Sequence, residues 1–105
     1  MPVITFIEPG GRRRDVAAAA GESAMLVATR HGVEGIIGEC GGSCMCATCH
    51  CYVDPRSARL LEPAEAMEIE TLEFTARELR AESRLACQIS LTDAHAGLVL
   101  HVVGA

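Results

Sequence analysis

The sequence contains few aromatic residues, and this limits the kind of core that it can build. Its 105 residues include two Phe, one Tyr and no Trp, although half of them are hydrophobic. So high a hydrophobic content excludes a disordered chain, and the core must consist mainly of Val, Ile, Leu and Ala side chains. A chain of this length can form one modest core, so we expect a single domain over residues 1–105.

Long hydrophobic runs are also absent. The longest is far shorter than the roughly 18 residues that cross a bilayer, and residues 1–8 have neither the basic start nor the long apolar region of a secretory signal. We therefore expect a cytoplasmic protein that does not bind membranes. Because the cytoplasm keeps thiols reduced, the six cysteines favour metal ligands with spare thiols over three disulfides.

Basic residues are missing from residues 62–73, where five glutamates lie. The other nine acidic residues balance the nine arginines of the chain, so this segment accounts for the formal net charge of -5. Such a molecule is a poor partner for nucleic acid and a good one for a basic protein surface. The five glutamates are Glu62, Glu65, Glu68, Glu70 and Glu73.

The first part of the chain has the pattern of a hairpin followed by a helix. Residues 3–7 are β-branched and aromatic, and the Pro-Gly-Gly turn after them predicts a hairpin with residues 14–18. Ser23 is suited to cap a helix over residues 24–31, which Gly32 would end. The side chains expected to face inward are those of Met25, Leu26 and Ala28.

The rest of the chain predicts a long loop between regular elements. Residues 33–50 are rich in glycine, and loops of this length in compact domains are usually functional. The succession strand, strand, helix, loop, strand, helix, strand, strand predicts an α+β domain with helices on one side of a mixed sheet, and a β-grasp fold accommodates it. The later elements are expected to be strands at 51–55, 87–91 and 98–103, and a helix from Pro63 to Leu72 that Leu61, Ile69 and Leu72 attach to the body.

Five of the six cysteines lie within residues 40–51, and the sixth is Cys87. Four of them have the spacing C-x5-C-x2-C-x37-C. Four thiolates can hold a 2Fe-2S cluster, and here three would come from one loop and the fourth from a distant strand. The first interval is one residue longer than in plant-type ferredoxins. The four candidate ligands are Cys40, Cys46, Cys49 and Cys87.

The sequence around these cysteines resembles a known family. The segments Cys40-Gly41-Gly42-Ser43, Cys46-Ala47-Thr48-Cys49-His50 and Ser83-Arg84-Leu85-Ala86-Cys87-Gln88-Ile89 are similar to those of vertebrate-type (adrenodoxin/putidaredoxin-like) 2Fe-2S ferredoxins. The resemblance covers nearly the whole chain. It implies a β-grasp fold, one 2Fe-2S cluster on the four named cysteines, and one-electron transfer without catalytic residues.

Small residues next to the ligands have a physical role beside this resemblance. Gly41 and Gly42 allow the backbone to approach a cluster and to point N–H groups at its sulfur atoms. Such hydrogen bonds tune the reduction potential. The hydroxyl of Ser43 is either a further donor of this kind or a solvated loop group.

Two cysteines remain outside the ligand set. Cys44 and Cys51 could each replace a ligand, but the family pattern assigns neither, so we take both as non-ligands. Similar spare cysteines occur in bacterial ferredoxins of cluster-assembly pathways, which keeps that role open. His50 follows a ligand directly, and we expect a structural histidine there because one-electron transfer needs no general acid.

The acidic helix is a candidate docking surface for electron-transfer partners. A carrier must bind and leave two partners in turn, and a salt-sensitive charged face suits this exchange. The resemblance implies that this helix meets an FAD-containing, NAD(P)H-dependent ferredoxin reductase and a cytochrome P-450 monooxygenase, each bound by a monomer of this chain. The candidate docking residues are Glu39, Glu62, Glu65, Glu68, Glu70 and Glu73.

Three other functions are compatible with parts of the sequence. The first is an electron donor for iron–sulfur cluster assembly. A structural zinc module could use the same thiolates, but it leaves the unequal spacing of the loop cysteines unexplained. A thioredoxin-like oxidoreductase could use Cys46 and Cys49, but it needs a helix after the motif, where this chain has a predicted strand.

Overall fold

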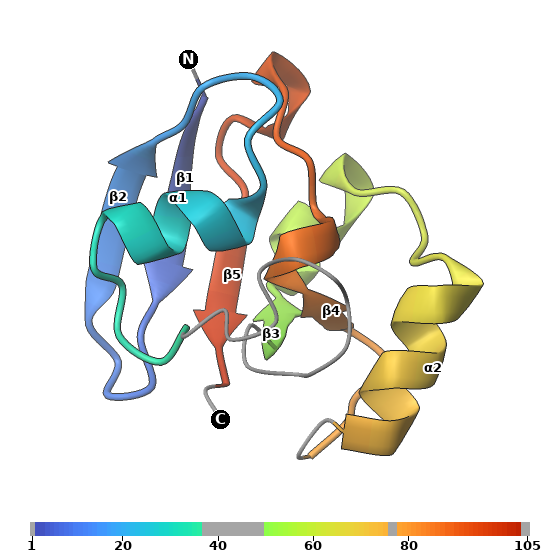
Figure 1. The fold of residues 1–105 in the computed structure, drawn as a ribbon. Helices are drawn as coiled ribbons and strands as arrows, with labels where there is room; N and C mark the ends of the chain where they lie inside the picture. The colour runs from blue at the N-terminus through green and yellow to red at the C-terminus, as the bar shows by residue number, and fades with distance from the viewer. Residues whose placement is uncertain (1, 37–49, 76–77, 104–105) are drawn as a thin grey trace.

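The computed structural model describes residues 2–36, 50–75 and 78–103. Within them, the chain forms a mixed five-stranded sheet with the strand order β2-β1-β5-β3-β4 (Figure 1). The central pair, β1 and β5, is parallel, and the other pairs are antiparallel. This arrangement confirms the predicted α+β, β-grasp fold. The strands are β1 (Val3–Ile7), β2 (Arg13–Ala17), β3 (His50–Val53), β4 (Ser83–Leu85) and β5 (Val99–Val102).

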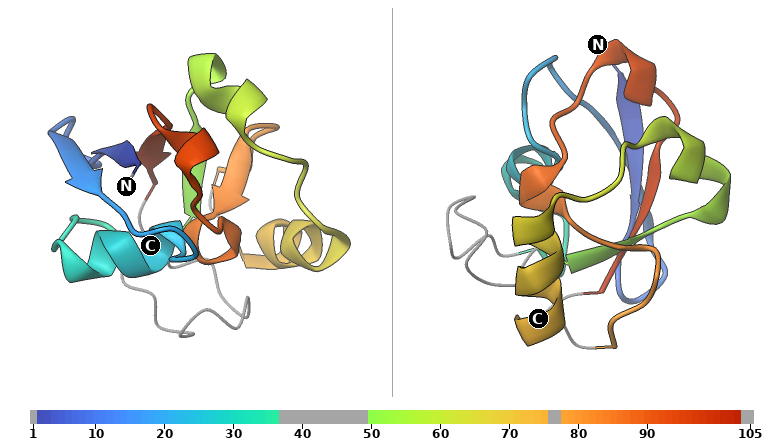
Figure 2. Two further views of the ribbon diagram at one scale, coloured as in Figure 1. Left: turned by 90° about the horizontal axis from the view of Figure 1, so that it is seen from above. Right: turned by 90° about the vertical axis from the view of Figure 1, so that its right-hand side faces the viewer.

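Two α-helices and three short 3₁₀ helices connect the strands. The helices α1 and α2 lie on the same side of the sheet, as predicted, and η1 lies on the other side (Figure 2). No helix in the described part of the chain has the length and apolar character needed to cross a membrane. The helices are α1 (Ala24–Arg30), α2 (Ala66–Thr75), η1 (Pro55–Leu60), η2 (Ala86–Gln88) and η3 (Asp93–His95).

The core is aliphatic, with a single aromatic side chain at its centre among the described residues. Ile4 and Phe6 of β1 are completely buried, and Leu100 of the neighbouring β5 is buried beside them. Neighbouring residues of a strand point to opposite faces. Val3, which precedes Ile4, therefore lies on the face away from this core, and it is half-exposed. Helix α1 closes this core from one side.

Helix α1 begins and ends at the predicted residues. The Ser23 hydroxyl accepts a hydrogen bond from the backbone N–H of Leu26 (3.0 Å), as an N-cap does. Gly32 follows the helix with φ of +69° and ends it. Met25 and Ala28 are buried, as predicted, and so are Ala24 and Val27, which were not predicted. The prediction for Leu26 is wrong: its side chain is 46% exposed, because residues two apart, such as Leu26 and Ala28, do not share a helix face.

Three predicted elements differ from the structure. Helix α2 runs over Ala66–Thr75 and not over residues 63–72. Strand β3 runs over His50–Val53 and not over residues 51–55, because Pro55 begins η1. Residues 87–91 do not form a strand, because their backbone groups bond to the segment before α1: Leu91 N–H donates to Glu22 O (2.8 Å), and Ile89 O accepts from Ala24 N–H (2.9 Å). A single bridge, Ser23 to Ser90, is all the β-pairing there.

Gly35 holds the last described turn before residues 37–49 against the end of the sheet. Its φ is +95°, a conformation that side chains with a Cβ adopt only under strain. A Cβ at this position would lie 2.8 Å from Val102 Cγ1 and 2.9 Å from Pro9 Cγ. The absence of a side chain therefore allows this turn to sit directly on β5 and on the hairpin turn.

The first prediction concerns this close approach. We expect Gly35→Ala to destabilise the fold by at least about 2 kcal/mol, because it combines a left-handed backbone with steric overlap. That corresponds to a fall of roughly 10 °C in the thermal midpoint, measured by circular dichroism. Gly10→Ala is the control, since a Cβ there meets no atom within 4 Å. Equal midpoints for the two variants would contradict the prediction.

Candidate metal centre

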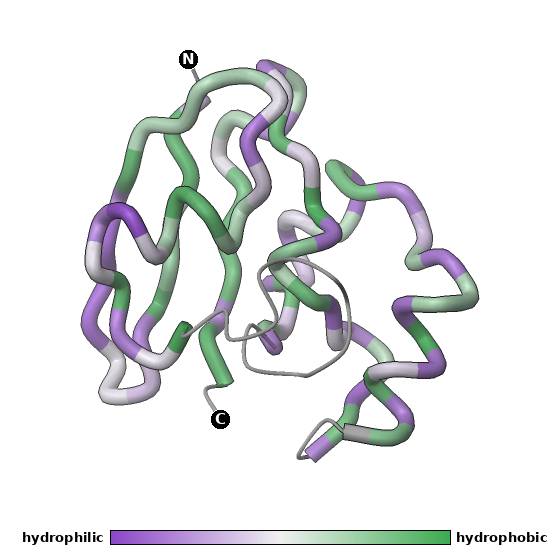
Figure 3. Tube along the Cα trace, in the orientation of Figure 1, coloured by the Kyte–Doolittle hydropathy of each residue, from purple (hydrophilic) through white to green (hydrophobic). Residues whose placement is uncertain are grey.

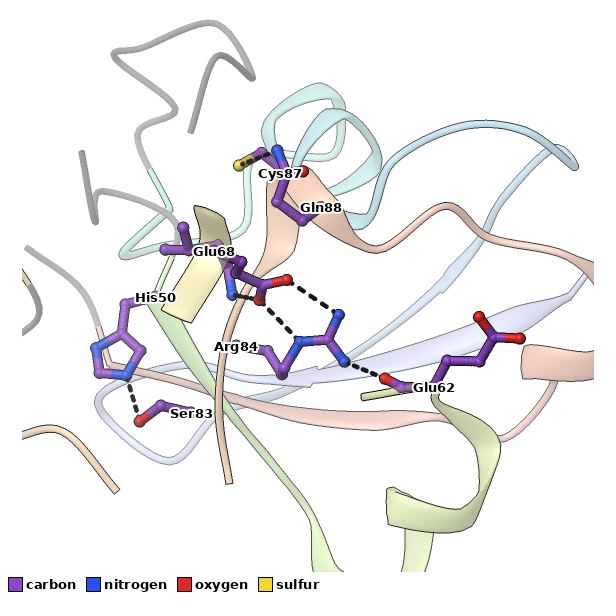
Figure 4. A network of polar contacts seen from close by, with 8 residues as sticks. His50, Glu62, Glu68, Ser83, Arg84, Cys87 and Gln88 are labelled. Atoms are coloured by element: carbon purple, nitrogen blue, oxygen red, sulfur yellow. Dashed lines mark hydrogen bonds and ion pairs between the residues drawn. The ribbon is translucent and has the colours of Figure 1, made fainter. Parts of the chain in front are cut away.

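Cys87 is the one predicted ligand within the described residues. It lies in η2, directly after β4, and its side chain is partly exposed. The side-chain amide of Gln88 donates a hydrogen bond to Cys87 Sγ (3.4 Å; Figure 4). An N–H directed at a ligand sulfur stabilises negative charge on it and shifts the reduction potential of a bound cluster. The prediction that Cys87 lies on a strand is thus wrong: Cys87 lies in a 3₁₀ turn that directly follows a strand.

The remaining predicted site residues of the loop lie outside the part of the chain that the structure describes. Among the described residues no group of three or more His, Cys, Asp or Glu side chains could hold a metal ion. The residues outside are Glu39, Cys40, Gly41, Gly42, Ser43, Cys44, Cys46 and Cys49.

The chain on the N-terminal side of this loop is held by a buried carboxylate. Glu8 is 4% exposed. It accepts hydrogen bonds from the backbone N–H of Glu34 (2.8 Å) and from Arg14 Nη1 (3.3 Å), and Arg14 also donates to His31 O (2.7 Å). A buried charge is stable only when it is paired in this way, so the hairpin turn fixes the position of residues 31–34.

The chain on the C-terminal side of the loop is held by His50. The ring is 1% exposed, and a hydrogen bond of 2.8 Å joins His50 Nε2 and Ser83 Oγ (Figure 4). Burial lowers the pKa of His50, which favours the neutral imidazole. Within the described residues its Nδ1 atom is buried without a hydrogen-bond partner. The prediction of a structural histidine agrees with this placement.

Cys51 differs from Cys87 in its surroundings. It lies completely inside the hydrophobic core, and burial raises the pKa of its thiol to about 12. A metal ligand must be a thiolate, and a thiol in this environment stays protonated. The structure therefore agrees with the prediction that Cys51 is not a ligand.

Taken together, the surroundings of Cys87 fit a cluster ligand and those of Cys51 do not. Cys87 has the exposure and the N–H donor that a ligand sulfur needs, whereas the other described cysteine is sealed in the core. The segments on both sides of residues 37–49 are fixed by buried hydrogen bonds to Glu8 and Ser83. The positions at which the chain enters and leaves residues 37–49 are thus fixed on the fold.

The acidic helix is attached to β4 by one of its own glutamates. Glu68 is 3% exposed. Its carboxylate accepts hydrogen bonds from Arg84 Nε (2.8 Å) and Nη2 (3.2 Å) and from the backbone N–H of Leu85 (2.8 Å; Figure 4). Arg84 also donates to Glu62 O (2.9 Å). The prediction that Glu68 is a docking charge is therefore wrong, because the carboxylate is buried and paired.

The other predicted docking residues on this segment are accessible. Leu72, a residue of α2, is buried, as predicted. The prediction that Ile69 also attaches the helix is wrong, because its side chain is 44% exposed. Figure 3 shows hydrophilic and hydrophobic residues interleaved along α2, so the helix has no simple apolar face. The exposed glutamates are Glu62, Glu65, Glu70 and Glu73.

The second prediction tests the role of the buried glutamate. Glu68→Gln leaves the Arg84 guanidinium without its counter-charge, so we expect about 3 kcal/mol of destabilisation and a thermal midpoint lower by about 10 °C or more. Glu65→Gln, on the segment just before the same helix but exposed, is the control and should change stability by less than about 0.5 kcal/mol. Equal midpoints by circular dichroism would show that the ion pair does not hold α2.

Comparison with known proteins gives consistent results over the whole chain. Residues 7–92 match the family model of the 2Fe-2S iron–sulfur cluster binding domain. A crystal structure of a ferredoxin from Rhodopseudomonas palustris HaA2 is 48% identical, with a TM-score of 0.90 over 96% of this chain and 95% of that one. Ferredoxin CarAc from Sphingomonas sp is 44% identical over 94% of this chain and 90% of that protein.

Putidaredoxin from Pseudomonas putida is 39% identical over 97% of this chain and 95% of that protein. Its structure in a covalent complex with putidaredoxin reductase has a TM-score of 0.90 to this fold, over 95% of this chain and 96% of that one. The family match covers most of the chain, and the strand order of the sheet is that of the β-grasp fold which the order of elements and the resemblance predicted. This chain therefore belongs to the 2Fe-2S ferredoxins, electron carriers that hold one 2Fe-2S cluster and are not enzymes.

Proposed function

We propose that this chain shuttles single electrons from an NAD(P)H-dependent, FAD-containing ferredoxin reductase to a cytochrome P-450 monooxygenase. The observation that carries the proposal is its similarity, over nearly the full length, to putidaredoxin, a protein whose structure in a complex with its reductase has this same fold. We further propose that it acts as a monomer with a single domain, in the cytoplasm, where thiols stay reduced.

Cys40, Cys46, Cys49 and Cys87 are the proposed ligands of the cluster. When bound, the 2Fe-2S cluster accepts and releases one electron at a time. The chain's own residues set the conditions for this: the Gln88 amide donates to the Cys87 sulfur, and η2 follows β4 without a connecting loop, which limits the movement of this ligand. A ligand that moves little lowers the reorganisation energy of electron transfer.

The docking surface of the proposal is the exposed acidic part of the chain. Glu62, Glu65, Glu70 and Glu73 are exposed, and they make a salt-sensitive face that a basic partner can bind and leave quickly. Glu39 stays a docking candidate from the sequence alone. Glu68 acts differently: through Arg84 and Leu85 it fixes α2 to the strand that precedes Cys87. The helix that meets the partner is thus bonded to the segment that carries a ligand.

A second candidate function is electron donation to iron–sulfur cluster assembly. The spare cysteines Cys44 and Cys51 are the observation that favours it, although Cys51 is sealed in the core and cannot contact a partner. Turnover with a cytochrome P-450 and with a cysteine desulfurase–scaffold mixture, each supplied with the same reduced protein, separates the two functions.

The third prediction concerns the ligands. Purified protein should be coloured and contain two iron and two acid-labile sulfide ions per chain. Cys87→Ser should lose the visible absorption, because a hydroxyl is a poor ligand for iron in place of a thiolate. Cys51→Ala should keep both the colour and the iron content, since that thiol lies in the core. A colourless wild-type protein would contradict the proposal, and so would loss of iron from Cys51→Ala alone.

The fourth prediction concerns docking. Replacing Glu65, Glu70 and Glu73 with Gln should raise the KM of the reductase for this protein by about fivefold or more at low ionic strength. It should also flatten the salt dependence of that KM, because charges that steer the encounter are removed. Asp15→Asn is the control, since Asp15 lies on β2, at the opposite edge of the sheet from β4, on which α2 packs. An unchanged KM and salt dependence for the triple variant would place docking on another surface.

A further inference from the structure

Helix α2 exposes two large apolar side chains on one side. Phe74 is 90% exposed and Met67 is 65% exposed. Residues seven apart lie on the same side of an α-helix, two turns apart, so these side chains form an apolar strip along α2. The contrast with the other phenylalanine is sharp, because Phe6 is completely buried.

This strip has no role in attaching the helix. The attachment lies on the other side of α2, where Glu68 and Leu72 are 3% exposed and face β4. Since Phe74 is two residues from Leu72, it points away from that contact. Exposed apolar groups of this size that do not serve folding mark interaction surfaces.

Acidic residues border the strip. Glu70 lies three residues after Met67 and four before Phe74, which puts it beside both on the helix surface. Glu73, on the same helix, and Glu65, just before it, are exposed as well. A fitting partner must therefore combine an apolar recess with a rim of Lys or Arg side chains.

Two other occupants fit this surface poorly. A second copy of the chain would bring the carboxylates of both helices together at one interface, and like charges at an interface cost affinity. A membrane surface carries anionic lipids, which repel an acidic helix.

We propose that Phe74, supported by Met67, is the apolar anchor through which α2 binds the flavoprotein reductase. This inference rests on the proposed function and names the residues that give the complex its lifetime. The glutamates speed the encounter, whereas a large side chain buried at the centre of an interface mainly slows dissociation. Because Glu68 bonds the opposite side of α2 to Leu85, two residues before Cys87, only the width of the helix, about 10 Å, separates a reductase seated on this strip from the segment that carries Cys87.

The experiment measures reduction of the cluster-containing protein by NADH and putidaredoxin reductase, followed by the loss of visible absorption. We expect Phe74→Ala to raise KM about 10- to 30-fold, as removal of an interface hot spot does, and Met67→Ala to raise it less. In both variants kcat and the salt dependence of KM should stay near the wild-type values, because the charges are intact. This distinguishes the anchor from the glutamates, whose removal flattens the salt dependence.

A matched control keeps the result specific. Leu26 is a partly exposed apolar residue on α1, and Leu26→Ala should leave KM unchanged. The visible spectrum and reduction by dithionite show that each variant holds its cluster independently of any partner. Retention of both by Phe74→Ala, together with the raised KM, supports the proposal.

The outcomes that overturn it are distinct. If the reductase reduces the wild-type protein and Phe74→Ala has the same KM, Phe74 is not the anchor, and the proposed function stands. If Phe74→Ala weakens only electron transfer to a cytochrome P-450, or abolishes a dimer seen by sedimentation, the strip belongs to the acceptor or to a second copy. If dithionite reduces the wild-type protein and putidaredoxin reductase does not, the reductase half of the proposed function fails, and this inference fails with it.

Discussion

The buried ion pair between Glu68 and Arg84 is the interaction on which the arrangement of the acidic helix depends. One carboxylate receives three hydrogen bonds, two from the guanidinium and one from the backbone N–H of Leu85. Taking the carboxylate out of water is costly, and only such complete pairing offsets it. The bonds also reach Glu62 O through Arg84. These bonds therefore join the segment before α2, the helix itself and the strand that leads to Cys87.

The same principle operates on both sides of residues 37–49. Glu8 is buried and bonded to the backbone of Glu34, and His50 is buried and bonded to Ser83. In each case a polar side chain from one element fixes backbone belonging to another. Apolar packing alone tolerates small shifts, whereas a buried hydrogen bond loses its partner when the elements slide. Polar groups at these positions thus fix the chain directly before and directly after residues 37–49.

Local signals in the sequence predicted the local structure well. Ser23 and Gly32 mark the two ends of α1 because capping and left-handed φ depend on the residue itself. The β-branched run at residues 3–7 is β1 for a similar reason. The cysteine spacing predicted the ligand set, and the resemblance of the segments around the cysteines predicted the family, which the family match confirms. Such features are encoded over a few neighbouring residues or in a fixed spacing.

Features that depend on tertiary partners could not be predicted. Residues 87–91 read as a strand, but the segment before α1 takes their hydrogen bonds, so Cys87 lies in a turn. Glu68 resembles its acidic neighbours in sequence, and only the position of Arg84, sixteen residues away, shows that it is buried. Composition alone gives each glutamate of the segment the same role.

Two residues of α2, a buried glutamate and an exposed phenylalanine, depart from the usual distribution, and they mark its two tasks. A surface helix selected for stability alone buries its apolar residues and exposes its charges. Here a glutamate is buried and a phenylalanine is 90% exposed, within one helix of ten residues. The buried glutamate is explained by attachment to the ligand-bearing segment. The exposed phenylalanine contributes little to the folded monomer, because its apolar surface remains in water. Its stabilising contact must therefore be made in a complex, on the side of the helix that folding leaves open.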